Sequence, residues 1–358
     1  MSDKVQNKTL LFKKVPTNAP IPGEHLAVEP VPFDLKPPKG GLTVAVLSAS
    51  YDPYLRGKMR DPSIKSYSPP FLVGEPITND TVSKVIRSDT PDFAEGDLIV
   101  AYLPLAEYAH LSADQLKDGT IRRRVDIKNS KIGKDLGLFL GPLGMPGLTA
   151  WSSYHEIGQP KKGETIFISS AAGAVGQVVG QVAKREGLRV IGSVGSDEKL
   201  DFILNELGFD GGFNYKTENP FDALKRLAPD GVDIYFENVG GEQLEAAIEA
   251  MNQHGRIIAC GMISQYSVPD EQKYGVKNLF KVVSKRIMMR GFIVYDKGFA
   301  DKYGEEHQRK MQEWLAEGSY KAKLSVTEGI DNAAEGLVGM LEGKNFGKAV
   351  LKIRDLEE

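Results

Sequence analysis

The stretch ISSAAGAVGQVVGQVAKREG, residues Ile168 to Gly187, decides the fold class. A run of apolar residues leads into Ala171, Gly173 and Gly176, which form an A-x-G-x-x-G spacing. In such a strand-to-helix turn, the second small residue lets the backbone approach a pyrophosphate, and the third lets the helix pack closely on the strand. Valines then recur at i, i+3, i+4 and i+7, which predicts a helix from Ala174 to Arg185 with one apolar face. We therefore expect a dinucleotide-binding turn, with a helix N-terminus that favours an anion.

The residue pattern on either side of this turn predicts two kinds of domain. Before residue 140, short β-rich runs alternate with Pro, Gly and Asp, as in a small barrel-like β domain. From Glu164 onward, strand and helix signals alternate, which predicts a doubly wound parallel sheet with crossover helices, an α/β fold. After Lys321, the segments LSVTEGI, AAEGLVGML and KAVLKI read as strand, helix and strand, and we expect them to rejoin the β domain. The predicted domains are residues 1–140, 141–320 and the returning segment 321–358.

The composition is that of an ordinary globular protein. The 358 residues are 41% hydrophobic and 26% charged, with a formal net charge of -3, so nothing favours nucleic acid or an anionic membrane as partner. No apolar run approaches the roughly 18 residues of a membrane span. The opening MSDKVQNKTL lacks the apolar core of a signal peptide, and we expect a cytoplasmic protein.

The cysteine and histidine content disfavours a metal centre. Cys260 is the single cysteine, which excludes an intramolecular disulfide and a multi-cysteine zinc site. Its place in the apolar run GRIIACG predicts a buried structural thiol. The five histidines are scattered and form no HExxH motif, so we predict no metal ligand.

The residues expected near the adenosine ribose favour NADP over NAD. An acid about 20 residues beyond the glycine turn usually binds the ribose of NAD, and that count leads to Asp197. The second strand, RVIGSV, has its tip at Ser196, so Asp197 falls in the first turn of the next helix, where the helix dipole and a Ser196 N-cap explain it. The tip then offers Ser196, Lys199, and Tyr215 with Lys216. Hydroxyls and cations suit a 2′-phosphate, which a carboxylate would repel.

Several motifs together resemble a known family. AAGAVG, GSDEKL, FNYKT, PDGVDIYFENVGGE, GRIIACGMISQY and GFIV, in this order, are similar to the zinc-free branch of the medium-chain dehydrogenase/reductase superfamily, and more narrowly to its NADP-dependent alkenal double-bond reductases and prostaglandin reductases. YDPYLRGKM, GPLGMPGLTAW and GKNFGKAVLK extend the resemblance to nearly the whole chain. The resemblance implies a Rossmann domain with a GroES-like β domain. It also implies a metal-free homodimer that uses NADPH to reduce the carbon-carbon double bond of α,β-unsaturated aldehydes and ketones.

The candidate site residues come from these motifs. The resemblance places the active-site tyrosine at Tyr266, and Tyr54 in DPYLRG is a second candidate hydroxyl. The stretch SVPDEQKYGVKNLF after Tyr266 is expected to shape the substrate pocket. The candidate cofactor-binding residues are Gly173, Ala174, Val175, Gly176, Ser196, Lys199, Tyr215, Asn238, Cys260, Gly261, Tyr266, Phe292, Val294 and Asn345.

The chemistry of such a reduction calls for a hydroxyl donor. A conjugated carbonyl accepts hydride at its β-carbon, and a donor at the carbonyl oxygen stabilises the enolate that develops there. Tyr266 follows Gly261 just beyond the predicted fifth strand, at the edge where doubly wound sheets bind ligands. A packing role is the alternative for both Tyr266 and Tyr54.

Two other functions fit parts of the sequence. A quinone reductase of the same superfamily would share the fold and the NADPH site, although the SQY and DPYLRG motifs argue against it. A non-catalytic NADPH-binding protein, structural or RNA-associated, is the alternative from another class, and the balanced charge disfavours RNA binding. A zinc alcohol dehydrogenase is excluded by the missing ligands.

Overall fold

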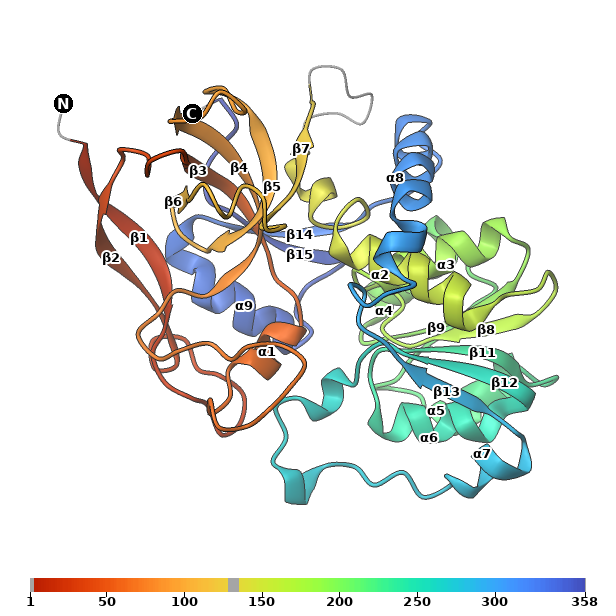
Figure 1. Ribbon diagram of the computed structural model, residues 1–358. Coiled ribbons are helices and arrows are strands. Elements are labelled where there is room, and N and C mark those ends of the chain that lie inside the picture. The colour runs from red at the N-terminus through yellow and green to blue at the C-terminus, as the bar shows by residue number, and fades with distance from the viewer. Residues whose placement is uncertain (1–2, 128–134, 358) are drawn as a thin grey trace. The chain divides into compact units, whose positions relative to one another are not determined.

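The computed structural model describes residues 3–127 and 135–357, and the chain divides into two units (Figure 1). Unit 1 comprises Met1–Leu140 and Leu324–Glu358, and unit 2 comprises Gly141–Lys323. Unit 1 is rich in antiparallel strands, and unit 2 holds a parallel sheet with helices. The predicted fold class, a doubly wound α/β domain with a second β-rich domain, is therefore confirmed.

Unit 1 is built on a seven-stranded sheet of order β14-β15-β3-β4-β5-β7, with β6 also paired to β3, and on a separate β1-β2 hairpin. The central strand β3 is buried along its whole length, because β4 covers one edge and β6 and β15 share the other. The strands of unit 1 are β1 (Lys4–Phe12), β2 (Leu26–Asp34), β3 (Leu42–Ser50), β4 (Thr78–Ser88), β5 (Leu98–Pro104), β6 (Tyr108–Leu111), β7 (Ile121–Val125), β14 (Leu324–Glu328) and β15 (Lys348–Lys352), and its α-helices are α1 (Tyr54–Lys58) and α9 (Ala333–Leu341).

Unit 2 is built on a six-stranded sheet of order β10-β9-β8-β11-β12-β13, in which every pair is parallel. All six carboxyl ends therefore lie along one edge, and the order reverses between β8 and β11. The strands are β8 (Thr165–Ile168), β9 (Arg189–Val194), β10 (Gly211–Asn214), β11 (Val232–Glu237), β12 (Met251–Ala259) and β13 (Met288–Gly291).

Helices cover both faces of the unit 2 sheet. Figure 1 shows α2, α3 and α8 on one face and α5 and α6 on the other. The apolar face predicted for α3 is confirmed, since Val178, Val179 and Val182 are at most 1% exposed. On the sheet itself, Phe167 stacks on Tyr235, with ring centroids 4.9 Å apart. The helices are α2 (Met145–Ser153), α3 (Gly176–Arg185), α4 (Asp197–Asp201), α5 (Pro220–Leu227), α6 (Gly241–Ala250), α7 (Phe280–Ser284) and α8 (Ala300–Ala316).

Two local expectations need correction. The helix predicted from Ala174 begins instead at Gly176, because the preceding residues belong to the turn that leaves β8. Cys260, expected to be buried, is half-buried, because β12 ends at Ala259 and residue 260 already belongs to the following loop. Burial nevertheless raises the pKa of the Cys260 thiol to about 12, so it is protonated at neutral pH.

Candidate cofactor and catalytic site

The glycine turn leaves β8 through a left-handed residue. Ser170 has φ of 52°, and its carbonyl oxygen accepts the amide of Gly173 at 2.9 Å. A Cβ on Gly176 would lie only 2.4 Å from the same carbonyl oxygen. Only glycine therefore allows α3 to start this close to the strand.

The start of α3 offers backbone donors. Within the described ranges, no hydrogen bond is recorded for the amides of Ala174, Val175 and Gly176. Such amides carry the positive end of the helix dipole and suit a phosphate. The turn therefore has donors that could hold the diphosphate of a dinucleotide.

The tips of β9 and β10 gather hydroxyls and cations. Ser196 caps α4, and its Oγ accepts the amide of Lys199 at 3.3 Å. Burial, together with the neighbouring cation of Lys216, lowers the pKa of the Lys199 ammonium. Two neighbouring ammonium groups offer positive charge to an anion. The Tyr215 hydroxyl lies at the same place, since a Cβ on Gly195 would stand 3.1 Å from it.

Asp197 is engaged elsewhere. Its Oδ1 accepts the side-chain amide of Asn214 at 2.8 Å, which ties the first turn of α4 to the end of β10. This carboxylate therefore has a structural contact in addition to its place in the first turn of the helix. The arrangement of Ser196, Lys199, Tyr215 and Lys216 fits a 2′-phosphate better than a free ribose.

Asn238 lies at the reversal of strand order. It follows β11, and its Nδ2 donates to the carbonyl oxygen of Ser169, which follows β8, at 2.8 Å. Its main-chain amide donates to the Ser169 hydroxyl at 3.0 Å. Ligands of doubly wound sheets bind in the crevice at this point. Asn238 is therefore held beside the glycine turn, as a cofactor contact requires.

Tyr266 folds back over the loop that follows β12. Its hydroxyl oxygen accepts the amide of Met262 at 3.0 Å. A Cβ on Gly261 would lie 2.8 Å from that oxygen, so glycine makes room for the phenol. The amides of Cys260 and Gly261 both donate to the carbonyl oxygen of Glu237 at 3.0 Å. The structure thus brings Cys260, Gly261 and Tyr266 close to Asn238.

Phe292 and Val294 follow β13 at the same edge of the sheet. Val294 is buried, and Phe292 stacks on Phe299 with centroids 5.1 Å apart. The segment predicted to shape the substrate pocket contains a single helical turn at Asp270–Gln272 and runs into α7.

Tyr54 and Asn345 belong to unit 1. The Tyr54 hydroxyl donates to Asn79 Oδ1 at 2.6 Å, and Asn79 Nδ2 in turn donates to the carboxylate of Asp52 at 2.9 Å. Lys348 completes this chain with a fully buried ion pair to Asp52 at 2.8 Å. Burial, followed by the neighbouring hydroxyl of Tyr102, raises the pKa of Tyr54 well above its usual value. Asn345 stands in the turn before β15, where its Nδ2 donates to the carbonyl oxygen of Gly347 at 2.8 Å.

Sequence reasoning missed Asn79 and Glu237. Nothing in TNDTVSKV distinguishes Asn79, because its role depends on Tyr54, 25 residues earlier. Glu237 had a signal: it is an acid that ends the strand VDIYFE directly after Ile234, Tyr235 and Phe236.

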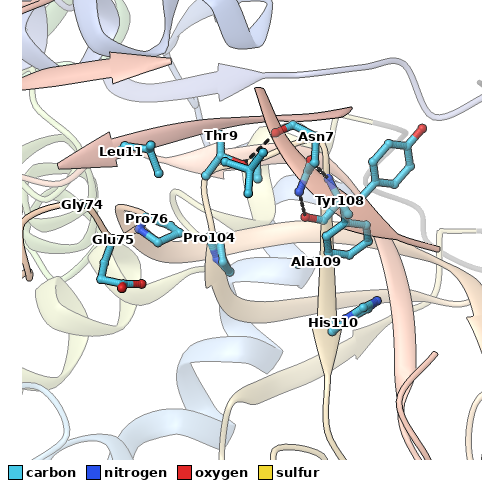
Figure 2. A pocket seen from close by; sticks show the side chains of 13 residues that line it. Asn7, Thr9, Leu11, Gly74, Glu75, Pro76, Pro104, Tyr108, Ala109 and His110 are labelled. Carbon is cyan, nitrogen blue, oxygen red and sulfur yellow. Dashed lines mark hydrogen bonds between the residues drawn. The ribbon is translucent and has the colours of Figure 1, made fainter. Parts of the chain in front are cut away.

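A shallow groove of about 310 Å³ lies elsewhere in unit 1 (Figure 2). Asn7 and Thr9 of β1 and Tyr108 and His110 of β6 are among the residues that line it. None of the candidate site residues does, so we do not assign the groove to the cofactor or to the substrate.

Neither a metal cluster nor a membrane span is found in the part of the chain that the structure describes. Residues 3–127 and 135–357 contain no group of three or more His, Cys, Asp or Glu side chains that could hold a metal ion. Across the same residues, no helix has the length and apolar character needed to cross a membrane.

Two family models match the chain. One, described as zinc-binding dehydrogenase, matches residues 174–313, and one described as the N-terminal domain of oxidoreductase matches residues 8–118. The donor set of the described residues does not fit the zinc that the first description names, because no cluster of ligands is present among them.

Curated relatives and a solved structure are similar to this chain over nearly its whole length. The NADP-dependent oxidoreductase RED1 of Cochliobolus heterostrophus is 51% identical, over 98% of this chain and 99% of its own length. The 2-alkenal reductase (NADP(+)-dependent) of Nicotiana tabacum is 42% identical, over 99% of both chains. The crystal structure of CurA in complex with NADPH from Vibrio vulnificus has a TM-score of 0.87 and 34% identity, over 97% of this chain and 99% of that one. The chain therefore belongs to the medium-chain dehydrogenase/reductase superfamily of oxidoreductases, in the NADP-dependent group that includes 2-alkenal reductases.

Proposed function

We propose that the protein uses NADPH to reduce the carbon-carbon double bond of α,β-unsaturated aldehydes and ketones. The 2-alkenal reductase of Nicotiana tabacum, at 42% identity over 99% of both chains, supports this activity. The observation that carries the proposal is the Tyr266 hydroxyl, held by the Met262 amide over Gly261 at the ligand-binding edge of the sheet.

The chain's own groups account for cofactor binding. NADPH, when bound, supplies the hydride. The amides of Val175 and Gly176 at the start of α3 would hold its diphosphate. Lys199 and Lys216, with the hydroxyls of Ser196 and Tyr215, would hold the 2′-phosphate, because two clustered ammonium groups favour an anion between them. Asn238, anchored to Ser169, would orient the other end of the cofactor at the strand reversal.

Tyr266 would stabilise the enolate. Its oxygen accepts one hydrogen bond from the Met262 amide. A phenol hydroxyl is also a hydrogen-bond donor, and we assign that donor to the substrate carbonyl oxygen. The amide also favours negative charge on the phenol oxygen, which strengthens the O–H as a donor. As hydride reaches the β-carbon, charge develops on the carbonyl oxygen, and this donor becomes more effective in the transition state than before it.

Tyr54 is a weaker candidate for the same role. Its hydroxyl donates to Asn79 Oδ1 at 2.6 Å, so its proton is already engaged. The raised pKa keeps the phenol neutral, and its oxygen can accept a hydrogen bond. Tyr54 is therefore better suited to hold a substrate or a water molecule than to stabilise an anion.

A substrate panel tests the proposal directly. NADPH oxidation is followed with a series of enals, enones and quinones at equal concentration. Enals and enones should be reduced faster than quinones, because the proposed hydroxyl donor acts on one carbonyl oxygen while hydride reaches the β-carbon. Faster turnover of quinones would assign the protein to the quinone reductases. NADPH binding with no turnover of any acceptor would favour a non-catalytic role.

We also propose that the protein forms a homodimer through β13. This strand lies at the edge of the unit 2 sheet and pairs only with β12 among the described residues. Met288 and Met289 on β13 are 38% and 37% exposed, and Phe280 on the neighbouring α7 is 76% exposed. An apolar edge strand of this kind readily pairs with a second copy of itself about a twofold axis.

Sedimentation velocity measures the state of assembly. Met289→Arg should shift a dimer toward monomer, because it places a charge in the paired edge. Val326→Arg is the matched control, since Val326 is 48% exposed on β14, the edge strand of the other sheet. A wild-type protein that sediments as a monomer would refute the interface.

A cytosolic location is the last part of the proposal. The formal net charge of -3 gives no electrostatic case for a nucleic-acid or anionic membrane partner. Cell fractionation followed by immunoblotting measures the location, and recovery in a membrane pellet would contradict a cytosolic one.

A further inference from the structure

Glu237, the last residue of β11, is a fully buried acid at the strand reversal. Its Oε1 accepts the amides of Val239 at 2.6 Å and Gly240 at 2.8 Å, and the hydroxyl of Tyr235 at 2.9 Å. Its Oε2 has no hydrogen-bond partner among the described residues. The carboxyl group therefore holds the turn after β11 through one oxygen, at the cost of leaving the other buried and unpaired.

The turn that Glu237 holds leads into α6. Gly240 has φ of 76°, and α6 begins at Gly241. A carboxylate at this place is favoured by the positive end of the helix dipole. Burial raises the pKa of the Glu237 carboxyl, and the surrounding donors oppose that change. The donors on Oε1 thus fit an oxygen that carries negative charge.

Ser169 connects the same carboxyl group to the glycine turn. The Ser169 hydroxyl lies 3.4 Å from Glu237 Oε1 and 3.0 Å from the hydroxyl of Tyr235. It also accepts the main-chain amide of Asn238 at 3.0 Å. The residue after β8 therefore bonds directly to the residue after β11, and its hydroxyl also contacts the Glu237 carboxyl group.

The main chain of Glu237 connects to the Tyr266 loop. Its carbonyl oxygen accepts the amides of Cys260 and Gly261, both at 3.0 Å. Those residues start the loop in which Met262 donates to the Tyr266 hydroxyl. Glu237 is thus within one or two hydrogen bonds of both Asn238 and Tyr266.

We propose that Glu237 is a positioning residue, which holds Asn238 and the Tyr266 loop in fixed positions relative to each other at the strand reversal. The inference rests on the proposed function, because it assigns Asn238 and Tyr266 to the reacting end of the cofactor. Glu237 acts through these residues and touches neither cofactor nor substrate. Misplacing a reacting group by about 1 Å can slow a reaction by about 100-fold, so such a residue should affect rate as well as stability.

The experiment compares Glu237→Gln with Asp233→Asn in the full-length enzyme. Asp233 is a matched control, because it is a half-buried acid near the start of the same strand whose Oδ2 accepts a main-chain amide, that of Thr165, at 2.8 Å. Three quantities are measured for each variant: the melting temperature, the Kd for NADPH from fluorescence, and the hydride-transfer rate at saturating NADPH by stopped flow. Hydrogen exchange of the peptides that cover residues 238–241 and 260–266 is followed in parallel.

We expect Glu237→Gln to slow hydride transfer by about tenfold or more, whereas Asp233→Asn leaves it unchanged. Exchange should rise in both peptides of Glu237→Gln. Combined with Tyr266→Phe, Glu237→Gln should lose less than the product of the two single losses, because misplacing an absent hydroxyl costs nothing further. Glu237→Asp, which retains the charge on a shorter side chain, should recover part of the rate.

Other results would overturn the inference. A Glu237→Gln enzyme with a lower melting temperature but unchanged rate and Kd would make Glu237 a purely structural acid. The same would follow if the rate loss of the double variant with Tyr266→Phe equalled the product of the two single losses. If Glu237→Gln does not fold, Ser169→Ala replaces it, since it removes the hydroxyl that contacts Glu237 Oε1 and accepts the Asn238 amide. An unchanged rate and Kd would again refute the role. If no enal is reduced, the proposed function fails, yet Kd and hydrogen exchange still test the positioning of the two loops.

Discussion

The Tyr266 hydroxyl gives the sharpest prediction. Tyr266→Phe keeps the ring over Gly261 and deletes only the oxygen that accepts the Met262 amide at 3.0 Å. If that hydroxyl stabilises the enolate, the hydride step should slow by about 10²–10⁴-fold, the usual range for a positioned acid. This loss corresponds to about 3–5 kcal/mol of transition-state stabilisation. The Kd for NADPH should hardly change.

The same geometry limits the effect on stability. The Met262 amide loses its acceptor in Tyr266→Phe, but Tyr266 is only half-buried, so water can replace the lost bond. The cost should be no more than about 1 kcal/mol of the free energy of unfolding. Gly261→Ala supplies an independent perturbation, because its Cβ would lie 2.8 Å from the phenol oxygen and would displace the hydroxyl without removing it. We expect this variant to be slow as well.

The assay is stopped-flow reduction of a simple enone, with NADPH deuterated at the transferred position to isolate the hydride step. Tyr54→Phe is measured beside it and should have the smaller effect, because the Tyr54 hydroxyl already donates to Asn79. A Tyr266→Phe rate within about threefold of wild type would refute the reasoning, since a donor that strengthens in the transition state must show in the rate.

Three further predictions concern the cofactor, metal and thiol. NADPH should be preferred over NADH by at least about tenfold in kcat/KM. Lys199→Ala should lose most of that preference, since a charge-assisted contact is worth roughly 1.5–3 kcal/mol before solvent screening. Unchanged selectivity of this variant in steady-state kinetics would place the 2′-phosphate site elsewhere. Activity should survive exhaustive chelation, and elemental analysis should find no stoichiometric zinc; a loss restored only by zinc would contradict this. The Cys260 thiol, with a pKa of about 12, should react slowly with iodoacetamide at pH 9 in the native protein and rapidly after denaturation, as followed by mass spectrometry. Because the thiolate forms more readily in the unfolded chain, Cys260 should also lower stability as the pH rises from about 9 toward 12.

Much of the fold could be predicted because its signals are local. The alternation of strand and helix patterns in unit 2, the valine face of α3 and the small residues at the turn depend on residues close together in the sequence. The interpretation of Asp197 as a helix residue and not a ribose ligand uses the same kind of local signal, a strand tip followed by an N-cap. The predicted start of α3 is less exact. The turn that begins at the left-handed Ser170 includes residues that the sequence pattern assigns to the helix, so α3 starts at Gly176.

The sequence by itself determined that this chain is a doubly wound nucleotide-binding protein with a second, β-rich domain. The periodicity of hydrophobic residues and the spacing of the glycines are local patterns, which can be recognised without the tertiary structure. Only the tertiary structure decided what surrounds the candidate site. The proximity of Lys216 to Lys199, the Met262 amide on the Tyr266 hydroxyl and the Asn79 acceptor of Tyr54 arise where separate segments meet. Glu237 is the clearest example: its neighbours come from the turns after β8, β11 and β12, which are far apart in sequence but adjacent in a parallel sheet, where all strands end at one edge.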